Sequence, residues 1–267
     1  MRKKLKRYQY LYIRYISQDL KRILEYQLDF FVQFFSTFLM QITGLATIWG
    51  IFTQVHEING WGYWEIIMVY SLMYFSIGFG EIFFEGPWSI NGLYHSGKLD
   101  YLLLRPVPIV FQVFASRIGL NGIGNIVTAI IVFITAWVHC SEAISILNVI
   151  LFLLLFMIAI PIKGAIILAA NCITFWTKSV GNAFGNLIHN VGEYTKYPIT
   201  IYPRVIQLIV TLIVPYAFVS FFPASLLLNK GPGAKLMWFA PVAAGYSIYL
   251  SVKLFKKGLT LYESVGN

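Results

Sequence analysis

Residues 147–160 read Leu-Asn-Val-Ile-Leu-Phe-Leu-Leu-Leu-Phe-Met-Ile-Ala-Ile, an almost unbroken run of apolar side chains. Membrane-spanning β-strands alternate apolar and polar residues, so this run is not a barrel strand. A helix needs about 20 apolar residues to cross a hydrocarbon core about 30 Å thick. Apolar sequence continues on both sides of the run, which reaches that length. The stretch therefore predicts a membrane-spanning helix.

The composition of the whole chain supports the same class. Of its 267 residues, 58% are hydrophobic and only 12% are charged, whereas an average soluble domain is about 25% charged. The 20 basic and 11 acidic side chains cannot supply the polar surface that a soluble enzyme of this size needs. A disordered chain would need low hydrophobicity. Cys140 and Cys172 form no paired motif, which argues against a disulfide scaffold or a zinc module.

The hydropathy pattern predicts an all-α polytopic membrane protein with one transmembrane domain over residues 29–260. Six apolar runs, each a predicted transmembrane helix, cover approximately 30–52, 66–84, 113–138, 146–175, 206–228 and 236–255. Residues 1–28 precede them as an amphipathic helix that we expect to lie along the inner membrane surface. Residues 261–267 form a short cytoplasmic tail.

The distribution of basic residues predicts the orientation. Seventeen of the 20 basic residues fall on one side of the six predicted spans, and only Lys230 and Lys235 fall on the other. The seventeen include Lys178, Lys196 and Arg204 from the connection before the fifth span. Basic residues concentrate on the cytoplasmic side of membrane proteins, so both termini are expected there. A basic cluster beside a hydrophobic span also predicts contact with anionic membrane lipids and no nucleic-acid partner.

Two connections on the predicted inner side stand out. Residues 86–108 contain several Gly and Pro turn signals, and residues 97–104 between them have the apolar and polar sides of a short helix. Residues 177–204 hold a second amphipathic stretch. This stretch is either another helix on the inner surface or a cytoplasmic extension of the fourth span.

Motifs for chemistry are sparse. Residues 92–98 match the first seven positions of a phosphate-binding loop, but Leu99 replaces the Ser or Thr that holds magnesium, and no buried strand precedes the loop. We therefore expect no ATP hydrolysis by this chain. The four histidines are scattered and suggest no metal site, and the spans contain no convincing catalytic set.

A few polar or helix-breaking residues within the spans are candidates for a transport pathway or a gate: Glu81, Glu85, Lys163, Pro215 and Pro223. An ionisable side chain inside a membrane is costly to bury and is often functional. The alternatives are that Lys163 extends to the inner interface or pairs with a neighbouring acid. The prolines suit a re-entrant outer segment, a helix that changes shape, or static kinks.

The inner connection resembles a signature of permeases in the type-2 ATP-binding-cassette exporter superfamily, in its branch of small six-helix permeases. The residues of this run are Gly97, Lys98, Leu99, Asp100, Tyr101, Leu102, Leu103, Leu104, Arg105 and Pro106, followed by Val107 and Pro108. The pairs Phe175-Trp176, Tyr197-Pro198, Tyr202-Pro203, Val214-Pro215 and Phe222-Pro223 are also similar to that branch.

The resemblance implies a bacterial cytoplasmic-membrane complex of two permease chains and two cytoplasmic ATPase subunits. The second permease is a related chain or another copy of this one. It implies that the run from Gly97 to Pro106 docks into an ATPase groove as a coupling helix. ATP and magnesium are bound by the ATPase, so no cofactor is expected in this chain. The implied activity is export of an amphiphilic lipid, drug, peptide or other natural product.

Two other functions stay open at this stage. An ion-gradient-driven secondary transporter would use Lys163 and the acids near it, and a non-transporting membrane scaffold would need no ATPase. One feature departs from the superfamily, because the predicted outer segment between the fifth and sixth spans is short. An outer re-entrant hairpin would then have to come from the proline-broken end of the fifth span.

Overall fold

A computed structural model of the protein describes residues 2–25, 27–119, 121–140 and 144–264. The predicted tail 261–267 and segment 1–28 therefore lie partly outside the described residues. Four described segments are long and apolar enough to cross a membrane. They are α2 (Gln27–Phe52), α3 (Tyr63–Phe84), α7 (Asn121–Cys140) and the continuous stretch Ile146–Thr177, which holds α8 (Ile146–Asn171) and α9 (Thr174–Thr177). The predicted class of a multi-pass helical membrane protein is confirmed.

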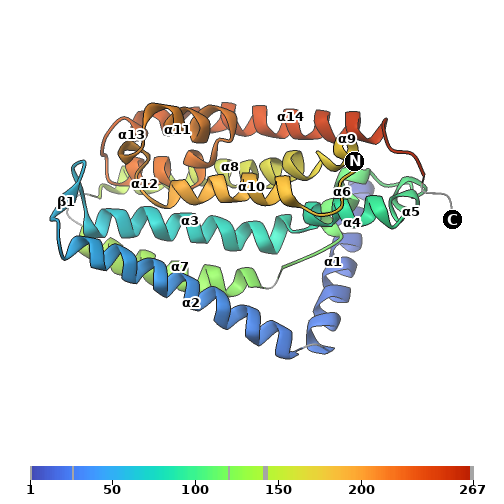
Figure 1. Ribbon diagram of the computed structural model, residues 1–267, viewed down its shortest axis with the longest axis horizontal. Helices are drawn as coiled ribbons and strands as arrows, with labels where there is room; N and C mark the ends of the chain where they lie inside the picture. The colour runs from blue at the N-terminus through green and yellow to red at the C-terminus, as the bar shows by residue number, and fades with distance from the viewer. Residues whose placement is uncertain (1, 26, 120, 141–143, 265–267) are drawn as a thin grey trace.

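The long helices lie side by side and give the molecule two ends (Figure 1). One end, called the hairpin end, carries the antiparallel strands β1 (Glu57–Ile58) and β2 (Trp61–Gly62). The other end, called the platform end, carries the short helices that follow α3. These are η1 (Gly86–Ser89), α4 (Ile90–His95), α5 (Leu99–Leu103) and α6 (Ile109–Ala115). Helix α1 (Arg2–Glu25) also lies at the platform end, at a steep angle to α2.

Helix α3 is the centre of the bundle, and most of its side chains are buried. It packs against α7 through glycines: a Cβ atom placed on Gly78 would lie only 2.6 Å from the carbonyl oxygen of Gly122. Small residues let two helices approach closely, which is how helices associate where the hydrophobic effect does not drive them together. Helix α2 lies outside this pair, against α7, and most of its surface is exposed.

The predicted span 206–228 is wrong as a single helix. The chain forms α11 (Arg204–Leu208) and a π-helical turn, η5 (Ile209–Ile213), and then turns back at Val214 and Pro215. It returns through η6 (Tyr216–Val219) and α12 (Phe221–Leu227) to α13 (Gly233–Leu236). The helix stops because Val214 leaves helical geometry, with φ −124° and ψ 80°, and Pro215 has no backbone N–H to continue the ladder. We call residues 204–227 the re-entrant hairpin.

For residues 177–204 the sequence left two alternatives, a helix on the inner surface or an extension of the fourth span. The structure shows a separate helix, since the fourth span ends at Thr177. Helix α10 (Ala183–Glu193) and the turns η3 (Tyr194–Lys196) and η4 (Ile199–Ile201) run along the bundle between its two ends (Figure 1). The start of this segment is held at the platform end, where the amide of Asn91 donates to the carbonyl oxygens of Ser179 and Gly181. Its far end is held at the hairpin end, where Asn59 Nδ2 donates to the carbonyl oxygen of Thr200 at 3.0 Å.

Two other predicted spans have different boundaries in the structure. The predicted span 113–138 is divided into α6 and α7 by a non-helical break before Asn121, where Gly119 N donates to the carbonyl oxygen of Glu81 at 2.9 Å. The last predicted span, 236–255, corresponds to η7 (Met237–Phe239) and α14 (Ala240–Leu259). Helix α14 packs along α8 and returns the chain to the platform end.

The path of residues 183–204 predicts a labelling pattern. In a chain without its native cysteines, Asn59→Cys and Arg204→Cys should react with a membrane-impermeant maleimide from the same side of the membrane, because both residues lie at the hairpin end. Ser179→Cys, at the platform end, should react only from the opposite side. Labelling of Arg204→Cys and Ser179→Cys from the same side would show that residues 183–204 do not cross the membrane.

Candidate functional site

The surface of the platform end carries an exposed apolar patch formed by Tyr101, Leu103 and Leu104. Their exposed fractions are 67%, 48% and 82%. All three come from α5 and the turn that follows it, inside the run predicted to dock on a partner. The charged side chains of Lys98 and Arg105 flank them and are exposed. Apolar side chains gathered on a surface and bordered by charge are typical of a protein interaction site.

The opposite face of α5 is anchored in a separate hydrophobic cluster. Leu99 is fully buried there and Leu102 packs against it. The cluster also takes in residues of α4, α6, α9 and α14 and of the end of α8: Ile90, Tyr94, Val113, Leu168, Cys172, Phe175 and Phe255. Close packing continues between α14 and α9, since a Cβ atom on Gly258 would lie 2.4 Å from the ring of Phe175. A displacement of α5 is therefore transmitted to the platform ends of α8 and α14 through packed side chains.

Two buried amides hold the platform backbone in place. Gln112, 1% exposed, donates from Nε2 to the carbonyl oxygens of Leu102 and Val107, both at 2.9 Å. Asn91 joins α4 to the segment before α10: it donates to Thr174 Oγ1 and accepts from Gly181 N at 2.9 Å. A buried amide that makes several hydrogen bonds fixes the relative position of the segments it joins.

The platform also contacts both terminal segments of the chain. Arg105 donates to the hydroxyl of Tyr15 in α1 at 2.8 Å, and Ser264 Oγ donates to a carboxylate oxygen of Asp100 at 2.6 Å. Burial and the nearby carboxylate of Asp100 raise the pKa of Tyr262 to about 12. Gly97 has φ +68°, a conformation that glycine adopts without strain, and it makes the turn between α4 and α5.

All ten residues from Gly97 to Pro106 thus form one continuous part of the platform. Sequence reasoning missed the residues that fasten it. Gln112 is a lone polar side chain in the apolar run Ile109–Phe114, which was a usable signal. Asn91 precedes Gly92 and has the appearance of an ordinary turn residue, so its partners at positions 174–181 were not accessible from the pattern.

A polar cavity of about 250 Å³ brings Glu81, Glu85 and Lys163 together. Its other lining residues are Ile77, Gly80, Trp88, Ile167, Asn186 and His189, from α3, η1, α8 and α10. Glu85 lies 4.0 Å from Arg117. Glu81 accepts a 2.7 Å hydrogen bond from Asn125, which in turn accepts one of 2.7 Å from the buried Gln41. This chain of amides links α2, α7 and α3 at membrane depth.

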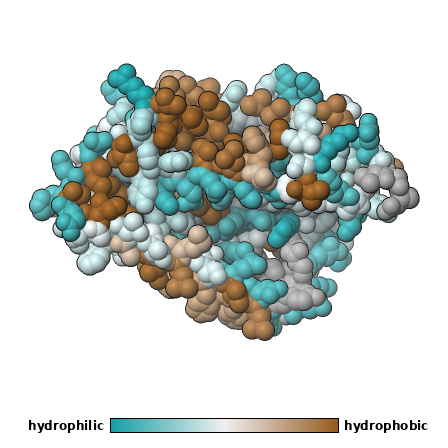
Figure 2. Space-filling model, viewed as in Figure 1, coloured by the Kyte–Doolittle hydropathy of each residue, from teal (hydrophilic) through white to brown (hydrophobic). Residues whose placement is uncertain are grey.

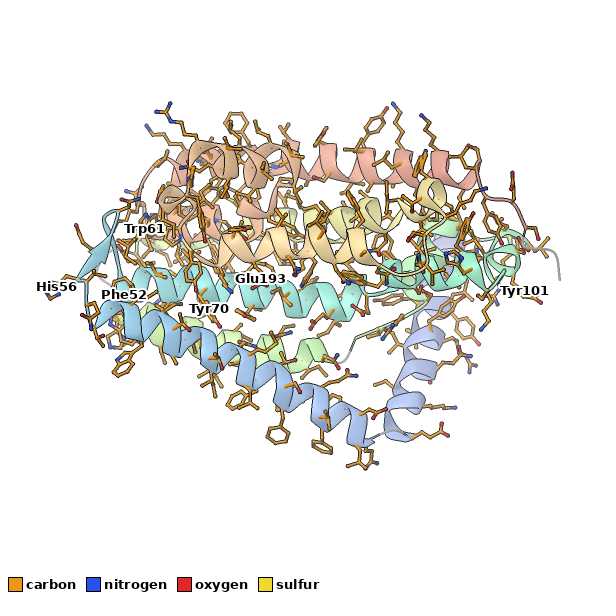
Figure 3. The ribbon with its side chains drawn as sticks, viewed as in Figure 1. Phe52, His56, Trp61, Tyr70, Tyr101 and Glu193 are labelled. Atoms are coloured by element: carbon orange, nitrogen blue, oxygen red, sulfur yellow. The ribbon has the colours of Figure 1, made fainter. Side chains whose placement is uncertain are left out.

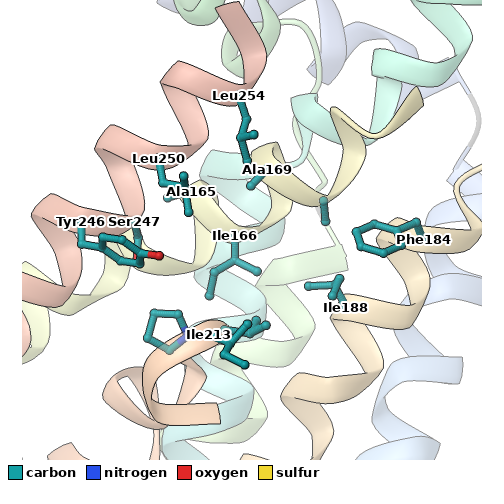
Figure 4. Close-up of a pocket in the computed structure, with 13 residues that line it drawn as sticks. Ala165, Ile166, Ala169, Phe184, Ile188, Ile213, Tyr246, Ser247, Leu250 and Leu254 are labelled. Carbon is teal, nitrogen blue, oxygen red and sulfur yellow. The ribbon is translucent and has the colours of Figure 1, made fainter. Parts of the chain in front are cut away.

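The two candidate prolines lie in the re-entrant hairpin. Pro215 forms its tip and lines an apolar cavity of about 250 Å³ together with Ala165, Ala169 and Leu250 from α8 and α14 (Figure 4). Pro223 is the third residue of α12, where a missing N–H costs no helical hydrogen bond. The tip of the hairpin therefore touches the middle of the bundle.

Helix α10 presents polar side chains at membrane depth. Asn186 and Asn190 are exposed, and Glu193 forms a 3.0 Å ion pair with Lys196. Figure 2 shows a hydrophilic band between two hydrophobic areas, over the part of the molecule where α3 and α10 lie in Figure 1. Tyr70 and Glu193 are labelled at this position in Figure 3. Polar side chains at membrane depth are expected to face water or protein and not lipid.

A comparison with protein families identifies the architecture. The family model described as ABC-2 family transporter protein matches residues 8–266. The chain belongs to the ABC-2 transporter family. This confirms the resemblance drawn from the run 97–108. The comparisons with curated proteins and with solved structures found no match.

Membership in the ABC-2 family makes this chain a permease component of a membrane transporter. Permeases of this family generally lack an ATPase of their own and act with ATP-binding-cassette subunits.

The double hydrogen bond of Gln112 predicts a local loss of stability. Gln112→Leu leaves two carbonyl oxygens without their donor, which costs about 1–3 kcal/mol for each buried group left unpaired. Hydrogen–deuterium exchange of the amides in α5 should speed up accordingly. Gln207→Leu is the matched control, because Gln207 makes a single 2.8 Å bond to the carbonyl oxygen of Tyr202 in the re-entrant hairpin. An unchanged rate of hydrogen–deuterium exchange in α5 of the Gln112→Leu variant would show that Gln112 does not hold the platform backbone in place.

Proposed function

We propose that this chain is the permease subunit of an ATP-driven exporter, working with a second permease and two separate ATPase subunits in a bacterial cytoplasmic membrane. The observation that carries the proposal is the two-sided packing of α5. Its outer face offers Tyr101, Leu103 and Leu104 to a partner, while its inner face is locked into the cluster around Leu99. A segment built in this way receives force from a partner and transmits it to the bundle.

The proposed topology has six crossings. Helices α2, α3, α7 and α8 supply four, the segment of α10, η3 and η4 supplies the fifth, and α14 supplies the sixth. The re-entrant hairpin enters from the hairpin end and does not cross. The platform end is placed in the cytoplasm, together with both termini. Basic residues support this orientation, since Lys98, Arg105 and three lysines near the end of α14 lie at the platform end. Arg204, which the sequence count placed on the inner side, lies at the hairpin end instead.

The polar band on α10 supports a pathway at the contact between the two permeases. Asn186, Asn190 and Glu193 occupy a face that lipid would not solvate. Helix α2 bounds the same part of the molecule and exposes large apolar side chains, among them Phe35 and Phe38. A polar strip beside an apolar surface suits an amphiphilic substrate, which has both kinds of group. The second permease, a related chain or another copy, closes this open side.

In the proposed mechanism, nucleotide binding draws the two ATPase subunits together and moves the docked α5. The buried cluster passes this movement to α8 and α14, and Asn91 passes it to the start of α10. The pathway then narrows toward the cytoplasm and opens toward the hairpin end. Nucleotide drives the change only to the extent that the docked ATPase favours one permease conformation over the other.

The docking role of α5 is tested with Leu103→Arg combined with Leu104→Arg. Both side chains are exposed, so the substitutions leave the core intact; Leu102 is unsuitable because it packs into the buried cluster. Two buried cations at the interface should cost several kcal/mol of binding free energy. The ATPase should no longer co-purify in mild detergent, and ATP-dependent transport should be lost.

The matched control is Val55→Arg, the same kind of change on an exposed residue at the hairpin end. It should leave both co-purification and transport unchanged. Full transport by the double variant would refute the coupling role. Transport that persists after nucleotide depletion, and that stops when the ion gradient is collapsed, would instead favour a secondary transporter.

A further inference from the structure

Lys163 is a buried cation whose hydrogen-bonding capacity is unused. It is 2% exposed, and its Nζ has no hydrogen-bond partner in the part of the chain that the structure describes. An ammonium group carries three donors, and leaving donors unpaired in the interior is costly. The side chain lines the polar cavity of about 250 Å³ between α3, α8 and α10. The site is therefore built around a donor that lacks an acceptor.

Each acid near Lys163 has a partner of its own. Glu81 accepts from Asn125 at 2.7 Å through one of its two carboxylate oxygens, and Glu85 lies 4.0 Å from Arg117. Glu81, Glu193 and Glu85 all attract Lys163, and Glu193 is paired with Lys196 at 3.0 Å, but none of the three is hydrogen-bonded to Lys163 Nζ in the described part of the chain. His189 is the remaining titratable side chain in the lining, and its Nδ1 has no partner either. Lys163 Nζ therefore lacks a group that accepts its hydrogen bonds.

We propose that this cavity binds an anionic oxygen group, a phosphate or a carboxylate, carried by a lipid headgroup or by a soluble anion. The oxygen atoms accept from Lys163 Nζ, a strong, charge-assisted hydrogen bond. Asn186 lines the cavity and is also exposed, so the site is reached from the polar band.

The size and place of the cavity fit this ligand class. A water molecule occupies about 30 Å³ in the liquid, so 250 Å³ holds a phosphate or carboxylate group with several waters. Glu85 and Trp88 line it just beyond the last residue of α3, Phe84, at the platform end. That is the level at which inner-leaflet headgroups lie in the proposed orientation.

The test uses the assembled complex of this chain with its ATPase subunits, in the absence of nucleotide. In the first arm the complex is placed in nanodiscs of phosphatidylcholine with a minor fraction of phosphatidylglycerol, and native mass spectrometry counts the phosphatidylglycerol retained on release. In the second arm, equilibrium dialysis in lipid-free detergent measures binding of radiolabelled inorganic phosphate. The variants are Lys163→Met and Lys163→Arg, with Lys253→Met as the matched control that removes an exposed lysine near the platform end.

Wild type, Lys163→Arg and Lys253→Met should all bind the anion, whereas Lys163→Met should bind it about tenfold more weakly, as expected for one lost charge-assisted hydrogen bond. Lysine-dependent retention in the first arm identifies a lipid headgroup as the source, and the same dependence in the second arm identifies a soluble anion. Equal binding by wild type and Lys163→Met in both arms, or no binding by wild type in either, would overturn the proposal.

Two further measurements keep the result interpretable. Thermal unfolding identifies any variant that fails to fold, and Lys163→Gln replaces Lys163→Met in that event, because it keeps a polar side chain without the charge. The variant with Leu103→Arg and Leu104→Arg should still retain phosphatidylglycerol, since the anion site does not depend on ATPase docking. Failure of the docking experiment therefore leaves the anion site standing, and failure of the anion experiment leaves the docking role standing.

Discussion

The fold of this permease depends on one constraint: hydrocarbon offers no hydrogen-bond partner to a polar group. The long helices meet it with their own backbone ladders. The re-entrant hairpin has no continuous ladder, and its returning half, η6 and α12, is tolerated because protein surrounds it. Val219, Phe222 and Ala224 are all fully buried, and Ser76 in α3 donates to the carbonyl oxygen of Val219 at 2.6 Å. Irregular backbone at this depth thus has a partner from a neighbouring helix.

The same constraint separates the surfaces of the bundle. The exposed side chains of α7 and of the first half of α8 are almost all aliphatic, such as Ile131 and Leu154, and suit lipid. Helix α10 instead exposes Asn186 and Asn190 beside Phe184 and Leu187, and its Glu193 is half-buried in an ion pair with Lys196. Amide side chains at membrane depth are better placed against water or protein than against lipid.

Much of the fold follows from the sequence, because the length of an apolar run reflects the thickness of the bilayer and the spacing of its polar residues reflects helical structure. The run 146–175 contains a helix that begins at Ile146, as predicted, and the run 97–106 contains the short helix α5, Leu99–Leu103. Residues 183–204 escaped prediction for a physical reason. A helix that packs along a bundle with one polar face has the same amphipathic pattern as a helix lying on the membrane surface, and the pattern cannot distinguish the two.

The candidate site was predictable only where it is contiguous. Gly97 to Pro106 lie together in the chain, so a motif can mark them. The cavity around Lys163 gathers residues from α3, α8 and α10, and its character depends on which of them already have partners. Glu81 and Lys163 stand out from the apolar sequence around them, but the sequence does not show that Asn125 donates to Glu81. The composition of a sequence does not show which hydrogen-bond partner a buried side chain takes.

Helix α10 joins the functional features that the rest of the fold keeps apart. Its start is tied to the platform through Asn91 and through Asn182, which donates to the carbonyl oxygen of Trp88 at 2.9 Å. Its middle lines the Lys163 cavity and the polar band, and the chain beyond it is tied to the β-hairpin through Asn59. Any tilt of the platform must therefore either break these bonds or carry α10 along. Because the hydrogen bonds of buried amide side chains are costly to break, α10 is expected to move with the platform. A movement of the proposed docking surface would then change the cavity and the proposed pathway together.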